Sequence, residues 1–269
     1  MSSKTDEKLK VLKDYISQFK KIIVAYSGGV DSTFLLKIAT DVLGRKNVLG
    51  ITAKSETYPS SELNDAIKMA KKFNFNHKII ETSELEIDNF ADNPIERCYY
   101  CKKELMMKLK AIAKKFNNAV IFDGTNYDDK SDHRPGMKAT RELNIKSPLL
   151  EYSFTKNDIR ELSREMNLPT ADKPSFACLA SRFPYGTRIT KERLKMIDKA
   201  ETFLRNLGVK QVRVRFHNEI ARIEVSEEDM KIIMKNKMVI VSKLKSFGFN
   251  YITLDLQGYR TGSMNEVLK

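Results

Sequence analysis

The first half of the chain carries short apolar runs separated by amphipathic stretches. Four runs predict β-strands, at residues 22–26, 48–54, 77–82 and 119–123. Around them, apolar residues recur every three to four positions, the spacing of one helix face. These stretches predict helices at 5–19, 32–43, 61–73, the later part of 94–116, and 156–166. Because strands alternate with helices, we predict a parallel α/β sheet whose ligands bind at the carboxyl ends of the strands.

The pattern changes after Thr190. It predicts a helix at 191–207, alternating strands at 211–216 and 220–225, one helix from Ser226 to about Phe247, and a strand at 251–256. The fold class predicted is therefore α/β, with a parallel-sheet domain over 1–187 and a smaller α+β domain over 188–269. Residues 168–187, which include three prolines and one glycine, lack periodicity, which is typical of a functional loop.

Composition narrows the class of protein. The 269 residues include 41% hydrophobic ones but no apolar run of about 18 residues, and the lysine-rich start has no apolar segment after it. We expect a cytoplasmic protein without membrane contact. The net charge is +13, yet lysines spread along predicted helices favour solvated helix faces over a dedicated nucleic-acid surface. tRNA stays a less favoured partner.

A glycine-rich turn follows the first predicted strand, with the sequence Ser27-Gly28-Gly29-Val30-Asp31-Ser32. Two glycines let the backbone approach a pyrophosphate, and the helix that follows adds N–H groups and its positive dipole end. Asp31 can hold a divalent cation such as Mg²⁺, which bridges phosphate oxygens. We predict that this loop binds ATP, with Asp31 and Ser32 in catalytic roles.

Three cysteines form the second chemical signal. Cys98 and Cys101 are three residues apart, which places both thiols on one side of a helical turn, and Cys178 lies in the long loop. Three thiolates suit an iron–sulfur cluster with one open iron. Zinc would need a fourth ligand, for which only His77, His133 and His217 exist. A redox pair and inert buried thiols are the other interpretations.

Several segments together resemble a known superfamily, the PP-loop ATP pyrophosphatases, and within it the LarE-type sulfur transferases. They are SGGVDS at 27–32, RCYYCK at 97–102, DGTNYDD at 123–129, HRPG at 133–136, PSFACLASRFPYG at 174–186, VRVRFHNEIARIEV at 212–225 and LDLQGYRTGSMNE at 254–266. The resemblance implies a PP-loop fold of the adenine nucleotide alpha hydrolase-like (HUP) type and cleavage of ATP to AMP and pyrophosphate.

The resemblance also implies a reaction. LarE-type enzymes adenylate the carboxylate of a small nucleotide-like substrate and replace its oxygen by sulfur, during synthesis of the nickel-pincer nucleotide cofactor. Some members sacrifice the sulfur of the loop cysteine. A chain with Cys98, Cys101 and Cys178 resembles the branch that holds a [4Fe-4S] cluster and delivers sulfide from an external donor. A homo-oligomer is a further implication.

Other matched residues receive candidate roles. Gly124 permits close approach of a nucleotide and Thr125 can donate to it, whereas Asp129 either orients ATP or metal or caps a turn. Arg213 and Arg215 share a strand face and suit the phosphate of a mononucleotide substrate, with isolated surface arginines as the alternative.

Matched residues with less defined roles lie in the predicted loop and the smaller domain. Ser181 and Arg182 are candidates to line a pocket beside Cys178. Glu201 could bind metal or substrate, but its amphipathic helix favours a solvated position. Arg222, Arg260 and Ser263 have no assigned role.

Three other functions compete. A tRNA-thiolating enzyme would explain the charge, but no flanking zinc-ribbon CxxC pairs are present. An amide-forming PP-loop ligase needs ammonia and has no use for three thiols. A zinc-stabilised nucleotide-binding module would bind ATP without releasing pyrophosphate.

Overall fold

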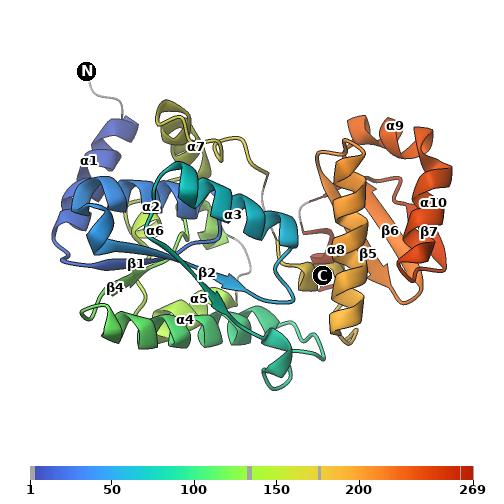
Figure 1. Cartoon of the computed structure of the whole chain (residues 1–269), viewed down its shortest axis with the longest axis horizontal. Coiled ribbons are helices and arrows are strands. Elements are labelled where there is room, and N and C mark those ends of the chain that lie inside the picture. The colour runs from blue at the N-terminus through green and yellow to red at the C-terminus, as the bar shows by residue number, and fades with distance from the viewer. Residues whose placement is uncertain (1–3, 132–134, 175–176, 261, 269) are drawn as a thin grey trace. The chain divides into compact units, whose positions relative to one another are not determined.

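The computed structural model describes residues 4–131, 135–174, 177–260 and 262–268, and its contacts divide the chain into two compact units (Figure 1). The first unit comprises Met1–Ser55, Ser61–Thr82 and Glu96–Phe176. The second comprises Glu56–Ser60, Ser83–Ile95 and Ala177–Lys269. Two short segments from the first hundred residues thus belong to the second unit. The domain limits 1–187 and 188–269 stay a prediction.

The first unit is built on a parallel sheet with strand order β3-β2-β1-β4. Its strands are β1 (Ile22–Ala25), β2 (Val48–Lys54), β3 (His77–Glu81) and β4 (Val120–Phe122). Every neighbouring pair is parallel, which confirms the predicted sheet.

Helices cover both faces of this sheet (Figure 1). Side chains of β1 alternate: Ile22 and Val24 join the core on one face, and Ile23 joins the core on the other. The first core includes residues of α1 (Lys4–Ser17), α2 (Val30–Leu43), α3 (Ser60–Lys72), α6 (Pro148–Glu151) and α7 (Lys156–Glu165). The second is closed by α4 (Arg97–Lys115), against which α5 (Gly136–Glu142) packs.

The second unit contains a three-stranded sheet of order β5-β6-β7. Strands β5 (Val212–His217) and β6 (Ile220–Val225) are antiparallel, and β7 (Tyr251–Leu254) runs parallel to β6. Helix α8 (Lys191–Asn206) packs against β5. Its buried residues Leu194, Ile197 and Leu204 recur at helical spacing.

The predicted single helix from Ser226 to about Phe247 is wrong in its middle. The structure has two helices, α9 (Glu227–Lys235) and α10 (Lys237–Ser246), separated by Asn236. Asn236 has φ −105° and ψ 15°, and its Nδ2 donates to the carbonyl of Ile232 at 2.9 Å. Asparagine side chains bond to the local backbone in this way, and so favour helix ends.

Short 3₁₀ helices complete the chain: η1 (Arg45–Asn47), η2 (Glu84–Glu86), η3 (Tyr127–Ser131), η4 (Leu179–Arg182) and η5 (Ser263–Leu268). The predicted irregular segment 168–187 therefore contains one turn of 3₁₀ helix, which follows Cys178 directly. In the part of the chain described above, no helix is both long and apolar enough to cross a membrane.

Candidate active site

The glycine-rich loop connects β1 to α2 in the first unit. Gly28 has φ +67°, and a Cβ atom there would lie 2.7 Å from the Cβ of Ala66, so conformation and space both require glycine. Helix α2 begins at Val30, and its N-cap residue Gly29 has no side chain that could cap it. An uncapped helix start with its dipole suits an anionic ligand.

Two serines shape this loop. The hydroxyl oxygens of Ser27 and Ser32 lie 3.1 Å apart. Ser32 Oγ accepts from the Ser27 N–H at 3.2 Å and donates to the Gly29 carbonyl at 3.3 Å. Because Ser32 is buried, these contacts hold the loop in shape. A catalytic role for Ser32 stays a prediction.

Asp31 lies next to polar side chains from two other segments, the loop after β4 and the start of α7. Lys156 Nζ contacts its Oδ2 at 2.5 Å and Asn126 Nδ2 donates to its Oδ1 at 3.3 Å. Both Asp31 and Lys156 keep partial exposure, 21% and 34% of their side chains. Lys156 is the first residue of α7, where the helix dipole disfavours a cation, so its place is explained by Asp31. The sequence did not predict Lys156 and Asn126 as site residues; a lysine in the first turn of a helix was the available signal.

The segment after β4 packs against the glycine-rich loop. A Cβ atom on Gly124 would lie 3.1 Å from the Ser32 nitrogen, so this glycine admits the loop itself. Thr125 Oγ1 donates to Asp123 Oδ2 at 2.9 Å. Asp129 Oδ2 accepts from the Asn126 N–H at 3.0 Å, which is the turn-capping role. The nucleotide roles of Gly124 and Thr125 stay predictions.

Asp123 connects the cysteine helix to this region. It is buried, accepts from Ser147 Oγ at 2.7 Å and lies 3.2 Å from Lys102 Nζ. Burial alone would raise the pKa of Asp123, but the Lys102 charge and the hydrogen bonds lower it. Since Lys102 follows Cys101 directly, the ion pair fixes the start of α4 to the carboxyl end of β4.

None of the three cysteines, all of which the structure describes, forms a disulfide bond. Cys98 is exposed and Cys101 half-buried, in the first turns of α4, which confirms their predicted helical placement. Cys178 is half-buried in the second unit. In the described residues, no group of three or more His, Cys, Asp and Glu side chains could hold a metal ion. His133, one candidate for a zinc site, lies outside the described residues.

Two other histidines were candidates for the same site. The Nε2 atom of His77 lies 2.8 Å from Thr52 Oγ1, and burial lowers the pKa of this histidine. His217 ends β5, where burial and Arg222 lower its pKa. Both shifts favour neutral imidazoles.

The turn that follows Cys178 contains a buried arginine, which forms an ion pair with a buried glutamate. Arg182 and Glu201 are both fully buried and form a two-pronged ion pair, with Nε–Oε1 at 2.8 Å and Nη2–Oε2 at 3.0 Å. The expectation of a solvated Glu201 is therefore wrong: its helix turns this position toward Arg182. Burial would raise the pKa of Glu201, but Arg182 lowers it to about 2.

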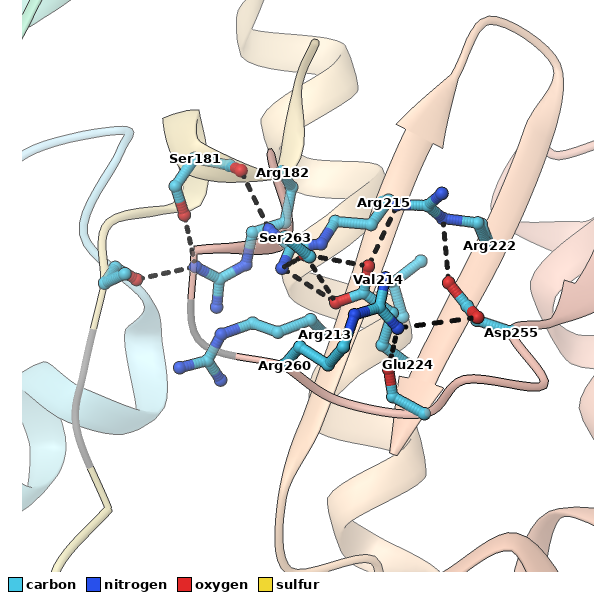
Figure 2. Close-up of polar contacts among 12 residues, drawn as sticks. Ser181, Arg182, Arg213, Val214, Arg215, Arg222, Glu224, Asp255, Arg260 and Ser263 are labelled. Carbon is cyan, nitrogen blue, oxygen red and sulfur yellow. Dashed lines mark hydrogen bonds and ion pairs between the residues drawn. The ribbon is translucent and has the colours of Figure 1, made fainter. Parts of the chain in front are cut away.

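Arg213 and Arg215 alternate along β5 and are both buried, so they are not isolated surface arginines (Figure 2). Arg215 pairs with Glu224 at 2.7 Å and donates to the Ser181 carbonyl at 2.9 Å. Its Nε has no hydrogen-bond partner among the described residues. Burial and the neighbouring Arg182 lower the pKa of Arg213 to about 10. An anion would relieve that unfavourable charge.

The residues without assigned roles join the same network (Figure 2). Ser263 Oγ lies 2.9 Å from Arg215 Nη2 and 3.2 Å from Glu224 Oε1. Arg222 pairs with Glu224 at 2.9 Å. Arg260 Nη1 lies 4.0 Å from Asp255 Oδ1, and Arg222 Nε lies 3.6 Å from the other oxygen of this carboxylate. The second unit thus gathers arginines around fully buried glutamates, a feature that periodicity could not reveal.

Comparison with known proteins gives consistent matches. The NAD synthase family model matches residues 5–177. The chain is 39% identical to the pyridinium-3,5-bisthiocarboxylic acid mononucleotide synthase of Lactiplantibacillus plantarum, over 94% of the chain and 92% of that protein. It is 41% identical to an uncharacterised protein of Synechocystis, over 98% of both chains. It is 39% identical to an uncharacterised protein of Methanocaldococcus jannaschii, over 90% of the chain and 92% of that protein.

The family model covers the whole α/β sheet and ends just before Cys178. The synthase match also takes in most of the second unit. The chain therefore belongs to the PP-loop superfamily of ATP pyrophosphatases, as a LarE-type member.

Proposed function

We propose that this protein is an ATP-dependent sulfur transferase that converts a carboxylate of a pyridinium mononucleotide into a thiocarboxylate, in synthesis of the nickel-pincer nucleotide cofactor. One structural observation carries the proposal. The turn that begins at Cys178 accepts a hydrogen bond from Arg215, through the Ser181 carbonyl. A thiol for sulfur delivery and arginines suited to a nucleotide phosphate are thus side by side in one unit.

The first step is activation of the carboxylate. A substrate carboxylate oxygen attacks the α-phosphorus of ATP, the bond to the β-phosphate oxygen breaks, and pyrophosphate leaves. The uncapped start of α2 and the ammonium of Lys156 stabilise the charge that develops on the phosphates. Asp31 fits Mg²⁺, because this ion takes one or two carboxylates together with phosphate oxygens. The ion would supply further charge compensation there.

The second step replaces oxygen by sulfur. A sulfide attacks the acyl adenylate carbon, and the carbon–oxygen bond to AMP breaks, which leaves a thiocarboxylate and AMP. Arg213 and Arg215 hold the substrate phosphate, since both are buried guanidiniums on one strand and Arg215 Nε has no hydrogen-bond partner among the described residues.

The sulfur source follows from the thiols. None of the three described cysteines, Cys98, Cys101 and Cys178, forms a disulfide bond, and each keeps exposed surface, so their donor chemistry fits a [4Fe-4S] cluster that leaves one iron open. When bound, such a cluster supplies sulfide from an external donor. Anaerobic purification followed by iron analysis tests this assignment: about four irons per chain, lost in Cys101→Ala, support it, and zinc or no metal in the wild type contradicts it.

The reaction is tested with ATP, Mg²⁺, sulfide and a pyridinium dicarboxylate mononucleotide. We expect pyrophosphate release that requires the mononucleotide, and a product in which mass spectrometry finds sulfur in place of oxygen. Cys178→Ser should still release pyrophosphate but form no thiocarboxylate. Pyrophosphate release at the same rate with and without the carboxylate substrate would contradict the proposal.

An amide-forming ligase is the second candidate, because the matching family model is that of NAD synthase. The same assay with ammonia in place of sulfide separates the two. A carboxamide product formed equally well by the wild type and by Cys178→Ser would favour the ligase. Addition of tRNA tests the thiolating alternative, for which sulfur would appear in the RNA. The cytoplasmic location and the homo-oligomer remain predictions.

A further inference from the structure

A single arginine binds both peptide groups that flank Cys178. Arg182 Nη1 lies 2.7 Å from the Ala177 carbonyl oxygen and 3.0 Å from the Cys178 carbonyl oxygen. The same nitrogen lies 2.9 Å from Ser181 Oγ, which itself donates to the Cys178 carbonyl at 2.8 Å. Because the carbonyls before and after Cys178 share one donor, the backbone angles of this residue are fixed. The direction of its Cα–Cβ bond is fixed with them.

The other side of this guanidinium is fixed by Glu201. The carboxylate accepts from Arg182 Nε and Nη2, from the Val214 N–H at 3.0 Å and from Arg205 Nη2 at 2.9 Å. One buried carboxylate thereby ties the arginine to helix α8 and to strand β5. The turn is attached to two regular elements through side chains that solvent does not reach.

A second arginine supports the end of the same turn. Arg215 Nη1 donates to the Ser181 carbonyl at 2.9 Å, and its Nη2 pairs with Glu224 at 2.7 Å. Figure 2 shows Ser181 and Arg182 next to Arg215, with Glu224 beyond. The turn therefore has attachments to α8, β5 and β6.

A purely stabilising role explains this arrangement poorly. A buried ion pair contributes little net stability, because desolvation of both charges offsets their attraction. Here the pair also orients the Arg182 guanidinium so that its Nη1 donates to the carbonyls of Ala177 and Cys178. Such supports are what hold a reacting group to within a fraction of an ångström.

We propose that Arg182 and Glu201 are positioning residues that set the direction of the Cys178 thiol for sulfur delivery. This inference rests on the sulfur transfer proposed above. The pair acts through the backbone of Cys178 and needs no contact with substrate. Its removal should loosen the turn and slow the second step, while carboxylate activation in the first unit proceeds as before.

The first test measures amide hydrogen exchange in the full chain for Arg182→Lys and Arg205→Ala. A lysine keeps a positive charge for the buried Glu201, but its compact ammonium cannot also reach the carbonyls of the turn. We expect exchange of residues 177–183 to rise about tenfold or more in Arg182→Lys, with α8 and β5 unchanged. Arg205→Ala is the matched control, because Arg205 binds the same Glu201 and, among the described residues, no hydrogen bond from its side chain to the turn is found.

Equal exchange of the turn in wild type and Arg182→Lys would overturn the proposal. So would a rise in Arg205→Ala as large as that in Arg182→Lys. A general rise across α8 and β5 would show that the arginine only stabilises the unit, which also contradicts the inference.

The second test separates the two chemical steps. In Arg182→Lys we expect thiocarboxylate formation to fall about 100-fold, the scale of a misplacement of about 1 Å, with an unchanged KM for ATP in pyrophosphate release. Unchanged thiocarboxylate formation despite a loosened turn would overturn the positioning role. If the wild type forms no thiocarboxylate but the exchange contrast holds, the proposed function fails and the attachment of the turn by Arg182 stands.

Discussion

The two units use opposite charges in opposite ways. In the first unit, Asp31 and Lys156 form an ion pair that remains partly open to solvent. In the second unit, Arg182 and Glu201 form an ion pair with no exposed surface. An exposed pair exchanges partners at little cost, since water and ions replace each partner. A buried pair cannot, because separation would leave a charge without solvent.

This difference assigns the pairs to different tasks. The open pair suits a site where a polyphosphate and its cation enter and leave in each cycle. The closed pair suits a support that keeps the same geometry throughout. If so, removal of one partner of the open pair should cost little stability, and removal of one buried charge should cost several kcal/mol.

The largest effect is expected from Glu201→Gln. Loss of the carboxylate charge leaves Arg182 buried without its counterion, so the free energy of unfolding should fall by about 3–5 kcal/mol. Denaturant titration with a structural probe in the second unit measures this change. Arg205→Ala should cost no more than about 1 kcal/mol, because Arg205 is partly exposed and Glu201 keeps Arg182. An equal loss of unfolding free energy in Glu201→Gln and Arg205→Ala would mean that the buried charge of Glu201 matters no more than the partly exposed charge of Arg205.

Asp31→Asn should lower activity strongly and leave the free energy of unfolding nearly unchanged. We expect pyrophosphate release to fall about 100-fold, because the developing phosphate charge loses its cation-binding carboxylate. The unfolding free energy should stay within about 1 kcal/mol of the wild type, since Asp31 keeps exposed surface. Asp41→Asn is the control: Asp41 pairs with Lys37 on the same helix. A large loss of stability in Asp31→Asn would erase the contrast between the units.

The sequence predicted the elements of the first unit closely, because their signals are local. Each strand is a short apolar run and each helix repeats its apolar face, so periodicity locates them without knowledge of the fold. The tight turn at the glycine-rich loop was equally predictable, because the positive φ of Gly28 is a local preference of glycine. The break at Asn236 was missed because one asparagine changes helix propensity only slightly.

The polar partners could not be predicted in the same way. Lys156 is 125 residues from Asp31 in the sequence, and no local pattern joins them. The amphipathic pattern of its helix predicts that Glu201 is solvated. In the structure, Arg182 from the turn after Cys178 forms an ion pair with it. Local sequence reports which face of a helix is apolar. It does not report which charge will be brought against a polar position by a distant segment.

The buried pair should also give the second unit a distinct acid response. The folded-state pKa of Glu201 is lowered to about 2, from an ordinary value of 4.5. Its contribution is therefore complete above about pH 4.5 and is lost as the pH falls toward 2, with a limiting slope of about 1.4 kcal/mol per pH unit. Denaturant titrations of wild type and Glu201→Gln across this range should converge. A constant difference between them down to pH 2 would show that Glu201 does not titrate in this way.

The smallest effect is expected from Lys156→Met, which sharpens the comparison from the side of the open pair. Without the ammonium, ATP phosphates lose one charged hydrogen bond, so the Kd for ATP should rise about tenfold. Asp31 remains solvated and keeps its place near Asn126, so the unfolding free energy should barely change. Isothermal titration of ATP, with Lys37→Met as the exposed-lysine control, measures the effect. An ATP affinity equal to that of the control would mean that Lys156 only neutralises Asp31, and the open pair would then be as structural as the buried one.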